Sequence, residues 1–302
     1  MELIYVLTDP ILPVFAIMAI GFVMGRTMII TVDDARVVNR FAMTILMPIL
    51  GFDLIANAPI YTFSIAPILI YACGQLLVFL IGFYIAANIF KFDSRQAVLL
   101  AFCSVFPNTV LYILPISKLL YGADQILPIT TIITWDASIA FGAVIIALQM
   151  IDLGKVAPSK VAKTLGKNPL LLSMVAGLFV SLMRIEIPDS IQTFLDFNGA
   201  AAPPVALFAL GVVLSQTRFT FELPIITFTL VKFIAFPMVI WLGFEIFAPD
   251  YLGRGQFLLG AAAPAGAMAF TLALLHGVKT DAIAQVIVIT SVITLGSLAL
   301  LA

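Results

Sequence analysis

Residues 96–123 read QAVLLAFCSVFPNTVLYILPISKLLYGA, an apolar run interrupted near its middle by Pro107, Asn108 and Thr109. An apolar run of about 20 residues is long enough to cross a bilayer as a helix. Proline lacks a backbone N–H and clashes with the carbonyl one turn back, so a helix breaks or kinks there. In lipid the freed backbone groups must be satisfied by protein or by a wet cavity. The stretch therefore predicts a membrane helix that is broken at mid-depth.

Composition outside this stretch also indicates a membrane protein. Of the 302 residues, 63% are hydrophobic and 10% are charged, and the mean hydropathy is +1.18. Soluble domains are about half apolar and about a quarter charged, so we expect lipid to be the solvent. The net charge of −1 argues against nucleic acid as a partner, because nucleic acid requires a basic face.

Apolar runs separated by charges and turn residues predict ten membrane helices and a polar linker at 152–167. The linker contains four lysines and divides the chain into halves of five helices, 1–151 and 168–302. We therefore expect an all-α membrane protein. The expected helices are 10–25, 37–57, 65–90, 97–120, 124–150, 168–184, 192–215, 222–247, 255–276 and 280–301.

The lysines and arginines predict the orientation of these helices. If the N-terminus is outside, eleven of them lie on the cytoplasmic side and three on the other. Cytoplasmic loops carry the excess of positive charge. We expect both termini outside and a cytoplasmic linker, in a plasma membrane of the bacterial inner-membrane type.

Prolines and glycines recur at nearly one spacing in the two halves. Pro264 follows Pro107 by 157 positions and Gly277 follows Gly122 by 155, and the same spacing of 155 separates Pro48 from Pro203. Because each half has five helices, the second is expected to be inverted relative to the first. Inverted repeats of this kind are typical of secondary transporters.

The second broken helix reads QFLLGAAAPAGAMAFTLALLHGV over 256–278. It is expected to run opposite to the first, so the half-helices that begin after Pro107 and Pro264 would face each other with their N-termini. Unpaired N–H groups and a partial positive charge at each N-terminus suit a carboxylate. Ala265 and Gly266 are small and would expose backbone N–H groups. We predict a site for a small organic anion here, with no cofactor and no metal.

Two polar side chains at the first break are candidates for contact with the anion. The amide of Asn108 offers donors and an acceptor, so it would hold a carboxylate directly; alternatively it caps the broken helix. Thr109 is the weaker candidate, because a helical threonine commonly bonds its own backbone.

Four stretches are similar to the auxin efflux carrier family: ILPVFAIMAIGFVMGR, VVNRFAMTILMPIL, FPNT and AAAPAGAMAFTLALLHGV. That family includes plant PIN-type carriers and bacterial relatives regarded as carriers of malonate or other carboxylates. The resemblance implies two inverted five-helix repeats, a crossing of helices four and nine at their prolines, elevator-like movement and a homodimer. It implies that Pro107 and Pro264 are the prolines at which the helices cross, and that Asn108 is the asparagine that faces the substrate.

Asp136 and Lys232 are the notable ionisable residues inside expected spans. Asp136 would either carry a proton and couple transport to the proton gradient, or pair with a neighbour or with water. Lys232 would attract an anion, snorkel to the cytoplasmic face or form a structural pair. We expect a structural pair.

Other classes of function fit less well. An intramembrane metalloenzyme needs clusters of histidine, cysteine or carboxylate, and the sequence has one histidine, His276, which we expect at an exposed helix end. A channel lacks a charged ring or a filter-like stretch. A membrane receptor that binds an anion without moving it remains the alternative to a carrier.

Overall fold

The computed structural model describes residues 16–122, 125–154, 166–216, 220 and 222–301. Residues 10–15 of the first expected helix and residues 155–165 of the expected linker lie outside the described part. Within that part the regular elements are all helices. An isolated β-bridge joins Pro107 to Ala265, which lie at the two helix breaks.

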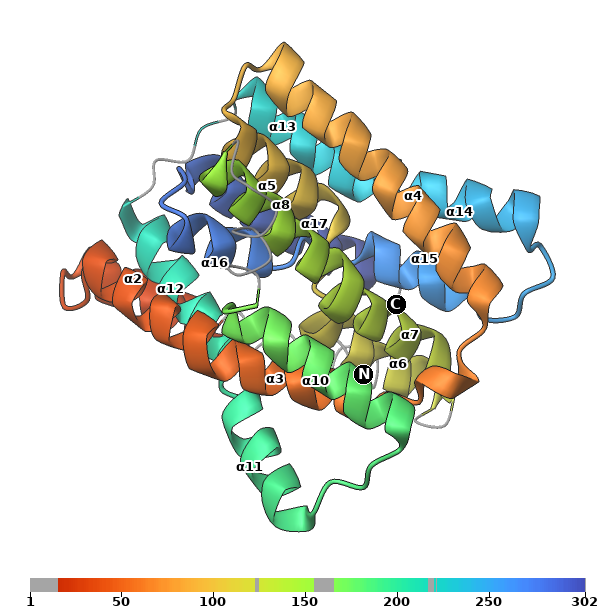
Figure 1. Cartoon of the computed structure of the whole chain (residues 1–302). Coiled ribbons are helices and arrows are strands. Elements are labelled where there is room, and N and C mark those ends of the chain that lie inside the picture. Colours follow the sequence, from red (N-terminus) through yellow and green to blue (C-terminus); the bar gives the residue numbers. More distant parts are fainter. Residues whose placement is uncertain (1–15, 123–124, 155–165, 217–219, 221, 302) are drawn as a thin grey trace.

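Several helices are continuous through a π-helical turn (η). The helices, shown in Figure 1, are Ala16–Arg26, α2 (Val32–Phe41), η1 (Ala42–Leu46), α3 (Met47–Ala56), α4 (Ile65–Tyr84), η3 (Ile85–Ile89), α5 (Ser94–Val105), η4 (Thr109–Ile113), α6 (Leu114–Tyr121), α7 (Leu127–Trp135), η6 (Asp136–Ala140), α8 (Phe141–Leu153), α10 (Pro169–Met183), α11 (Asp189–Gly199), α12 (Ala202–Gln216), α13 (Leu223–Leu230), η7 (Val231–Ala235), α14 (Phe236–Phe247), α15 (Arg254–Ala262), α16 (Met268–Leu275) and α17 (Asp281–Leu301). A short 3₁₀ turn, η2 (Ile60–Thr62), lies between α3 and α4.

Each of the ten expected segments contains helix, and five continuous helices are long and apolar enough to cross a membrane. Their exposed residues are mostly large and hydrophobic, as lipid contact requires. The five are Val32–Ala56, Ile65–Ile89, Leu127–Leu153, Asp189–Gln216 and Leu223–Phe247.

The second helix begins earlier than the sequence predicted. The charged residues before position 37 were assigned to a loop, yet α2 starts at Val32. Thr31 and Asp34 form a capping box, in which each side chain accepts a hydrogen bond from the other residue's backbone N–H. This cap satisfies N–H groups that the first turn leaves unpaired, so charged residues begin the helix.

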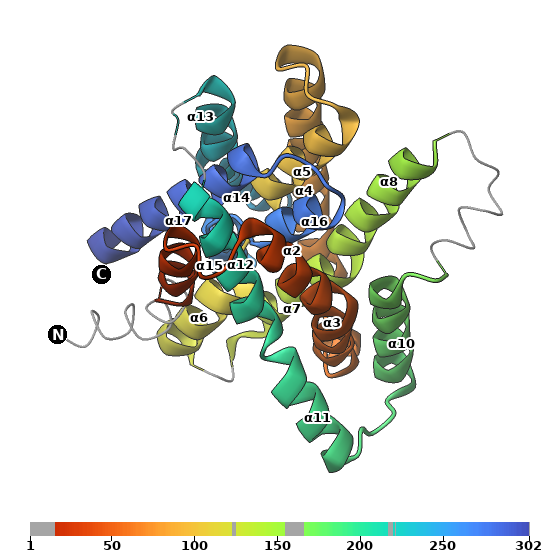
Figure 2. The ribbon, with the colours of Figure 1, turned by 90° about the vertical axis from the view of Figure 1, so that its left-hand side faces the viewer.

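The helices pack in two groups. The α3 group consists of Ala16–Arg26, α2–α3, α10 and α11–α12; α3 packs against α10 and α11, and α2 packs against α12. The α5 group holds the remaining helices, with α5 touching α4, α8, α16 and α17. Both views show α11 projecting from one edge of the molecule (Figures 1 and 2).

Small residues let the first helix approach α12 closely. A Cβ on Gly21 would overlap the carbonyl of Phe208, and a Cβ on Gly211 would overlap the carbonyl of Met18. Small residues at such contacts are the usual basis of tight helix packing in membranes. The α3 group is therefore closely packed at this contact.

Candidate functional site

The first break separates α5 from η4. The helix ends at Val105, Phe106 adopts an extended conformation (φ −98°, ψ 106°), and Asn108 precedes the first residue of η4. Pro107 lies between them and has no N–H to donate. The chain therefore changes from helix to extended backbone and back to helix at the proline, as the sequence predicted.

The second break separates α15 from α16. The helix ends at Ala262, Ala263 is extended (ψ 154°), and Ala267 precedes α16. Pro264 lies between Ala263 and Ala265. A Cβ on Gly266 would stand 2.8 Å from the ring of Phe106, so this position accepts only glycine without a shift of its neighbours.

The two breaks bind each other through their backbones. Pro107 and Ala265 form an antiparallel β-bridge. The N–H of Asn108 donates to the carbonyl of Pro264 at 2.8 Å, and the N–H of Gly266 donates to the carbonyl of Phe106, also at 2.8 Å. Buried backbone groups require partners, and each break supplies partners for the other.

A cavity of about 90 Å³ lies beside this bridge. That volume has room for several water-sized groups. One wall is formed by the first break and by Asp136, and Gly266 to Met268 contribute from the second break. The α3 group forms the opposite wall, with Met47, Leu50, Gly51, Leu54, Leu170, Met174 and Pro203.

The polar side chains of the first break are not used by the helix that follows. Asn108 is partly exposed, lines the cavity and makes no capping hydrogen bond, so the capping alternative for its side chain is wrong. Thr109 is 3% exposed, and its hydroxyl has no hydrogen-bond partner among the described residues. Buried polar groups without partners are rare, and both residues therefore have free capacity to bind a ligand.

Asp136 joins the cavity to a buried polar network. The side chain is 3% exposed and begins η6 in the middle of the α7–α8 helix. Gln75 donates to its Oδ1 at 2.7 Å and Tyr71 donates to its Oδ2 at 3.3 Å. Trp135 in turn donates to Gln75. Of the expected alternatives, the structure shows a carboxyl group that is paired with neighbours.

Lys232 lies behind the second break, outside the cavity lining. It is 1% exposed, so the expectation that it snorkels to the surface is wrong. Its Nζ donates to the carbonyl of Ala261 at 2.9 Å and lies 4.8 Å from the ring centroid of Phe236.

The predicted residues divide into those that line the cavity and those that support it. Pro107, Asn108, Thr109, Gly266 and Asp136 line the cavity. Pro264 and Ala265 support the cavity through the backbone contacts between the two breaks. Lys232 lies behind the second break and bonds the carbonyl of Ala261.

Sequence reasoning missed Gln75, which contacts Asp136 and the carbonyl of Val105. The sequence feature that could have identified Gln75 is its amide side chain within a 25-residue apolar helix. Such a group needs partners in lipid.

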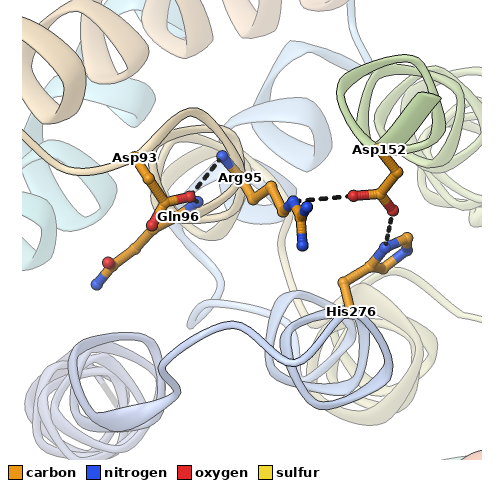
Figure 3. Close-up of polar contacts among 5 residues, drawn as sticks. All are labelled: Asp93, Arg95, Gln96, Asp152 and His276. Carbon is orange, nitrogen blue, oxygen red and sulfur yellow. Dashed lines mark hydrogen bonds and ion pairs between the residues drawn. The ribbon is translucent and has the colours of Figure 1, made fainter. Parts of the chain in front are cut away.

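A second polar cluster lies at the ends of three helices (Figure 3). The carboxylate of Asp152 at the end of α8 bridges Arg95 Nε at 2.8 Å and His276 Nδ1 at 2.9 Å. His276 stands at the end of α16, as expected, and its side chain is 12% exposed because it pairs with Asp152. Among the described residues no group of histidine, cysteine and carboxylate side chains is arranged to hold a metal.

Apolar helices, two breaks joined by a β-bridge and a small cavity describe the class of a membrane protein with an internal site. The family described as Membrane transport protein matches residues 6–157 and 156–302. The chain belongs to this family, which confirms the resemblance to auxin efflux carriers. It is a transporter and not an enzyme.

Two relatives are similar over nearly the whole chain. A putative malonate transporter of Rhizobium meliloti (strain 1021) is 23% identical over 305 residues, which cover 96% of this chain and 93% of the relative. An uncharacterized transporter of Methanocaldococcus jannaschii is 23% identical over 302 residues, which cover 97% and 96% of the two chains.

Proposed function

We propose that this protein is a secondary carrier that moves a small organic anion, a carboxylate such as malonate or an auxin-like acid, across the membrane. The anion is held between the two breaks. The observation that carries the proposal is the cavity beside the bridge, where the Asn108 amide makes no cap and the Thr109 hydroxyl has no partner in the described chain. The helix N-termini at both breaks add partial positive charge.

The proposal includes an inverted repeat, with residues 1–151 and 168–302 as its halves and 152–167 as a cytoplasmic linker. The antiparallel bridge between the two breaks supports opposite directions for their chains. Gly122 (φ 85°) and Gly277 (φ 63°) follow the two half-helices and share the left-handed conformation. In this arrangement both termini are outside, helices four and nine cross at the bridge, and two copies form a homodimer in a bacterial inner membrane.

The position of the cavity supports alternating access. Its two walls come from different packing groups, the α3 group and the α5 group. If the α5 group moves as a unit against the α3 group, in the manner of an elevator, the cavity opens to one side at a time. A proton on Asp136 would accompany the anion, because Asp136 lines the same cavity.

The test is uptake of radiolabelled malonate, other short carboxylates and indole-3-acetate into proteoliposomes. Wild type is expected to show saturable uptake, and Asn108→Ala to reduce it by about tenfold or more, since a hydrogen bond to a charged group contributes about 1.5–3 kcal/mol. Asn198→Ala is the matched control, because Asn198 on α11 donates only to its own helix.

Thr109→Val tests the second polar side chain at the first break. Its matched control is Thr130→Val, because the hydroxyl of Thr130 donates to a carbonyl of its own helix, that of Ile126. Saturable binding of a carboxylate without uptake would favour a membrane receptor. Equal uptake by Asn108→Ala and wild type would contradict the proposal that the anion binds between the two breaks.

A further inference from the structure

Lys232 supplies a hydrogen bond that the second break removes. In an unbroken helix the carbonyl of Ala261 would accept from the N–H of Ala265, four residues on. Ala265 instead donates to the hydroxyl of Thr290 at 3.1 Å. The ammonium of Lys232, from η7, takes its place on the carbonyl of Ala261 at 2.9 Å.

Gln75 does the corresponding work at the first break. Its Nε2 atom donates to the carbonyl of Val105, the last residue of α5, at 3.1 Å. Both supporting side chains are buried, Gln75 at 5% and Lys232 at 1% exposed. In each half, therefore, a buried side chain from the third helix holds a carbonyl at the end of the fourth helix.

The spacing of the two supports equals the spacing of the two prolines. Lys232 follows Gln75 by 157 positions, as Pro264 follows Pro107. The acceptor carbonyls differ by one residue from this spacing, because Ala261 follows Val105 by 156 positions. The two supports thus occupy equivalent places, and they differ in charge.

An amide would satisfy the carbonyl without a charge, as it does at the first break. Burial of a charge in lipid is expensive and by default marks function. In the described part of the chain, Asp136 and Lys232 are the two charged side chains that are buried. Asp136 faces the cavity, and Lys232 is linked to it through the contacting rings of Phe236 and Tyr71.

We propose that Lys232 is a positioning residue for the transported anion: it holds the second break in shape, and its charge makes the adjoining cavity favourable for an anion beside Asp136. The inference rests on the proposed function. The ammonium need not touch the anion, because a charge in a medium of low dielectric acts over several ångströms. The asymmetry between the amide at one break and the ammonium at the other assigns the electrostatic role to the second half.

Two substitutions separate the hydrogen bond from the charge. Lys232→Gln places at the second break the amide that the first break already uses, so a hydrogen-bond donor remains and the charge is lost. Lys232→Met removes both. Lys279→Gln is the matched control, because it removes one positive charge from an exposed position.

The charge is tested by uptake of malonate, a dianion above neutral pH, and of its monomethyl ester, a monoanion. For Lys232→Gln we expect KM to rise about tenfold for the dianion and about threefold for the monoanion, since the interaction scales with ligand charge. If the role of Lys232 were purely structural, the substitution would change KM by the same factor for both substrates. Equal changes, or a KM unchanged from wild type, would overturn the electrostatic role.

The hydrogen bond is tested without substrate, by amide hydrogen exchange of the peptide that spans residues 254–275. We expect faster exchange in Lys232→Met than in wild type, and wild-type exchange in Lys232→Gln. Wild-type exchange in Lys232→Met would overturn the positioning role. A wild-type protein that takes up no carboxylate contradicts the proposed function itself, and the exchange result is then still decisive for the break.

Discussion

Asp136 is the residue at which the cavity and the buried polar network meet. Its two oxygens accept from Gln75 and Tyr71, and the residue also lines the cavity beside Asn108. In the proposed mechanism this carboxyl group gains or loses a proton as the anion arrives. Its chemistry therefore suits a group that links proton movement to anion movement.

Asp136→Asn keeps the shape of the side chain and removes its ability to titrate. We expect uptake driven by an imposed proton gradient to fall to the level seen without a gradient, whereas exchange of labelled for unlabelled anion persists. The measurement is malonate uptake into proteoliposomes with and without a pH difference. Asp250→Asn, at an exposed loop position, is the control. Gradient-driven uptake in Asp136→Asn at the wild-type rate would exclude Asp136 as the coupling group.

Gln75 is expected to be structural in the first instance. Gln75→Leu leaves the indole N–H of Trp135 and the carbonyl of Val105 without their observed partner. Each unsatisfied buried group costs about 1–3 kcal/mol, so thermal unfolding in detergent should occur at a clearly lower temperature. Gln192→Leu, a substitution on the partly exposed α11, should lower the temperature less, and an equal loss in the two variants would argue against this reading.

Residue identity predicted which residues line the cavity better than it predicted their hydrogen-bond partners. Pro107, Asn108 and Asp136 are conspicuous because they interrupt apolar runs, and the structure places all three on one cavity. The pairing of Gln75 with Asp136 depends on how α4 packs against α7–α8, and no local pattern encodes that. The burial of Lys232 was missed for the same reason. The expectation that it snorkels came from its position along the helix, and this position does not show which helices cover the side chain.

At the scale of helices, π-turns and glycines decide how the elements fit. Pro48 and Pro237 each lie two positions beyond a π-turn, η1 and η7, which lets the helix pass the missing N–H without breaking. Pro107 and Pro264 have no such turn before them, and there the helix breaks. The sequence predicted prolines as interruptions, but which prolines break a helix depends on partners from other helices.

Gly211→Val should disrupt the contact between α12 and the helix Ala16–Arg26. A side chain at this position overlaps the carbonyl of Met18, and overpacking of this kind costs about 1–3 kcal/mol. We expect a lower unfolding temperature in detergent. Gly255→Ala is the control, because a Cβ there meets nothing closer than 3.7 Å. A stable Gly211→Val variant would mean that these helices are not held at this contact.

At the scale of the whole molecule, the cavity lies on the seam between the α3 group and the α5 group. A buried hydrogen bond between described residues crosses this seam, from the side chain of Asn39 on α2 to the carbonyl of Thr271 on α16, at 3.0 Å. Movement of one group against the other must break it. The seam is consequently the place to test whether transport requires relative movement.

A reversible cross-link across the seam is expected to stop transport. The pair Asn39→Cys and Thr271→Cys, in a protein that also carries Cys73→Ala, would be oxidised to a disulfide and released again by a reductant. Uptake should fall to background after cross-linking and return after cleavage, while each single variant keeps its activity. Full uptake by the cross-linked protein would show that the two groups do not move apart at this point.

The most direct measurement is a structure determined with a bromine-substituted malonate at a concentration that saturates uptake. The account predicts bromine signal in the cavity beside the bridge, with a carboxylate within hydrogen-bond distance of the Asn108 side chain. The same sample prepared from Asn108→Ala should lose the signal. Bromine signal at another site, or an empty cavity while uptake is saturated, would contradict the claim that the anion is held between the two breaks.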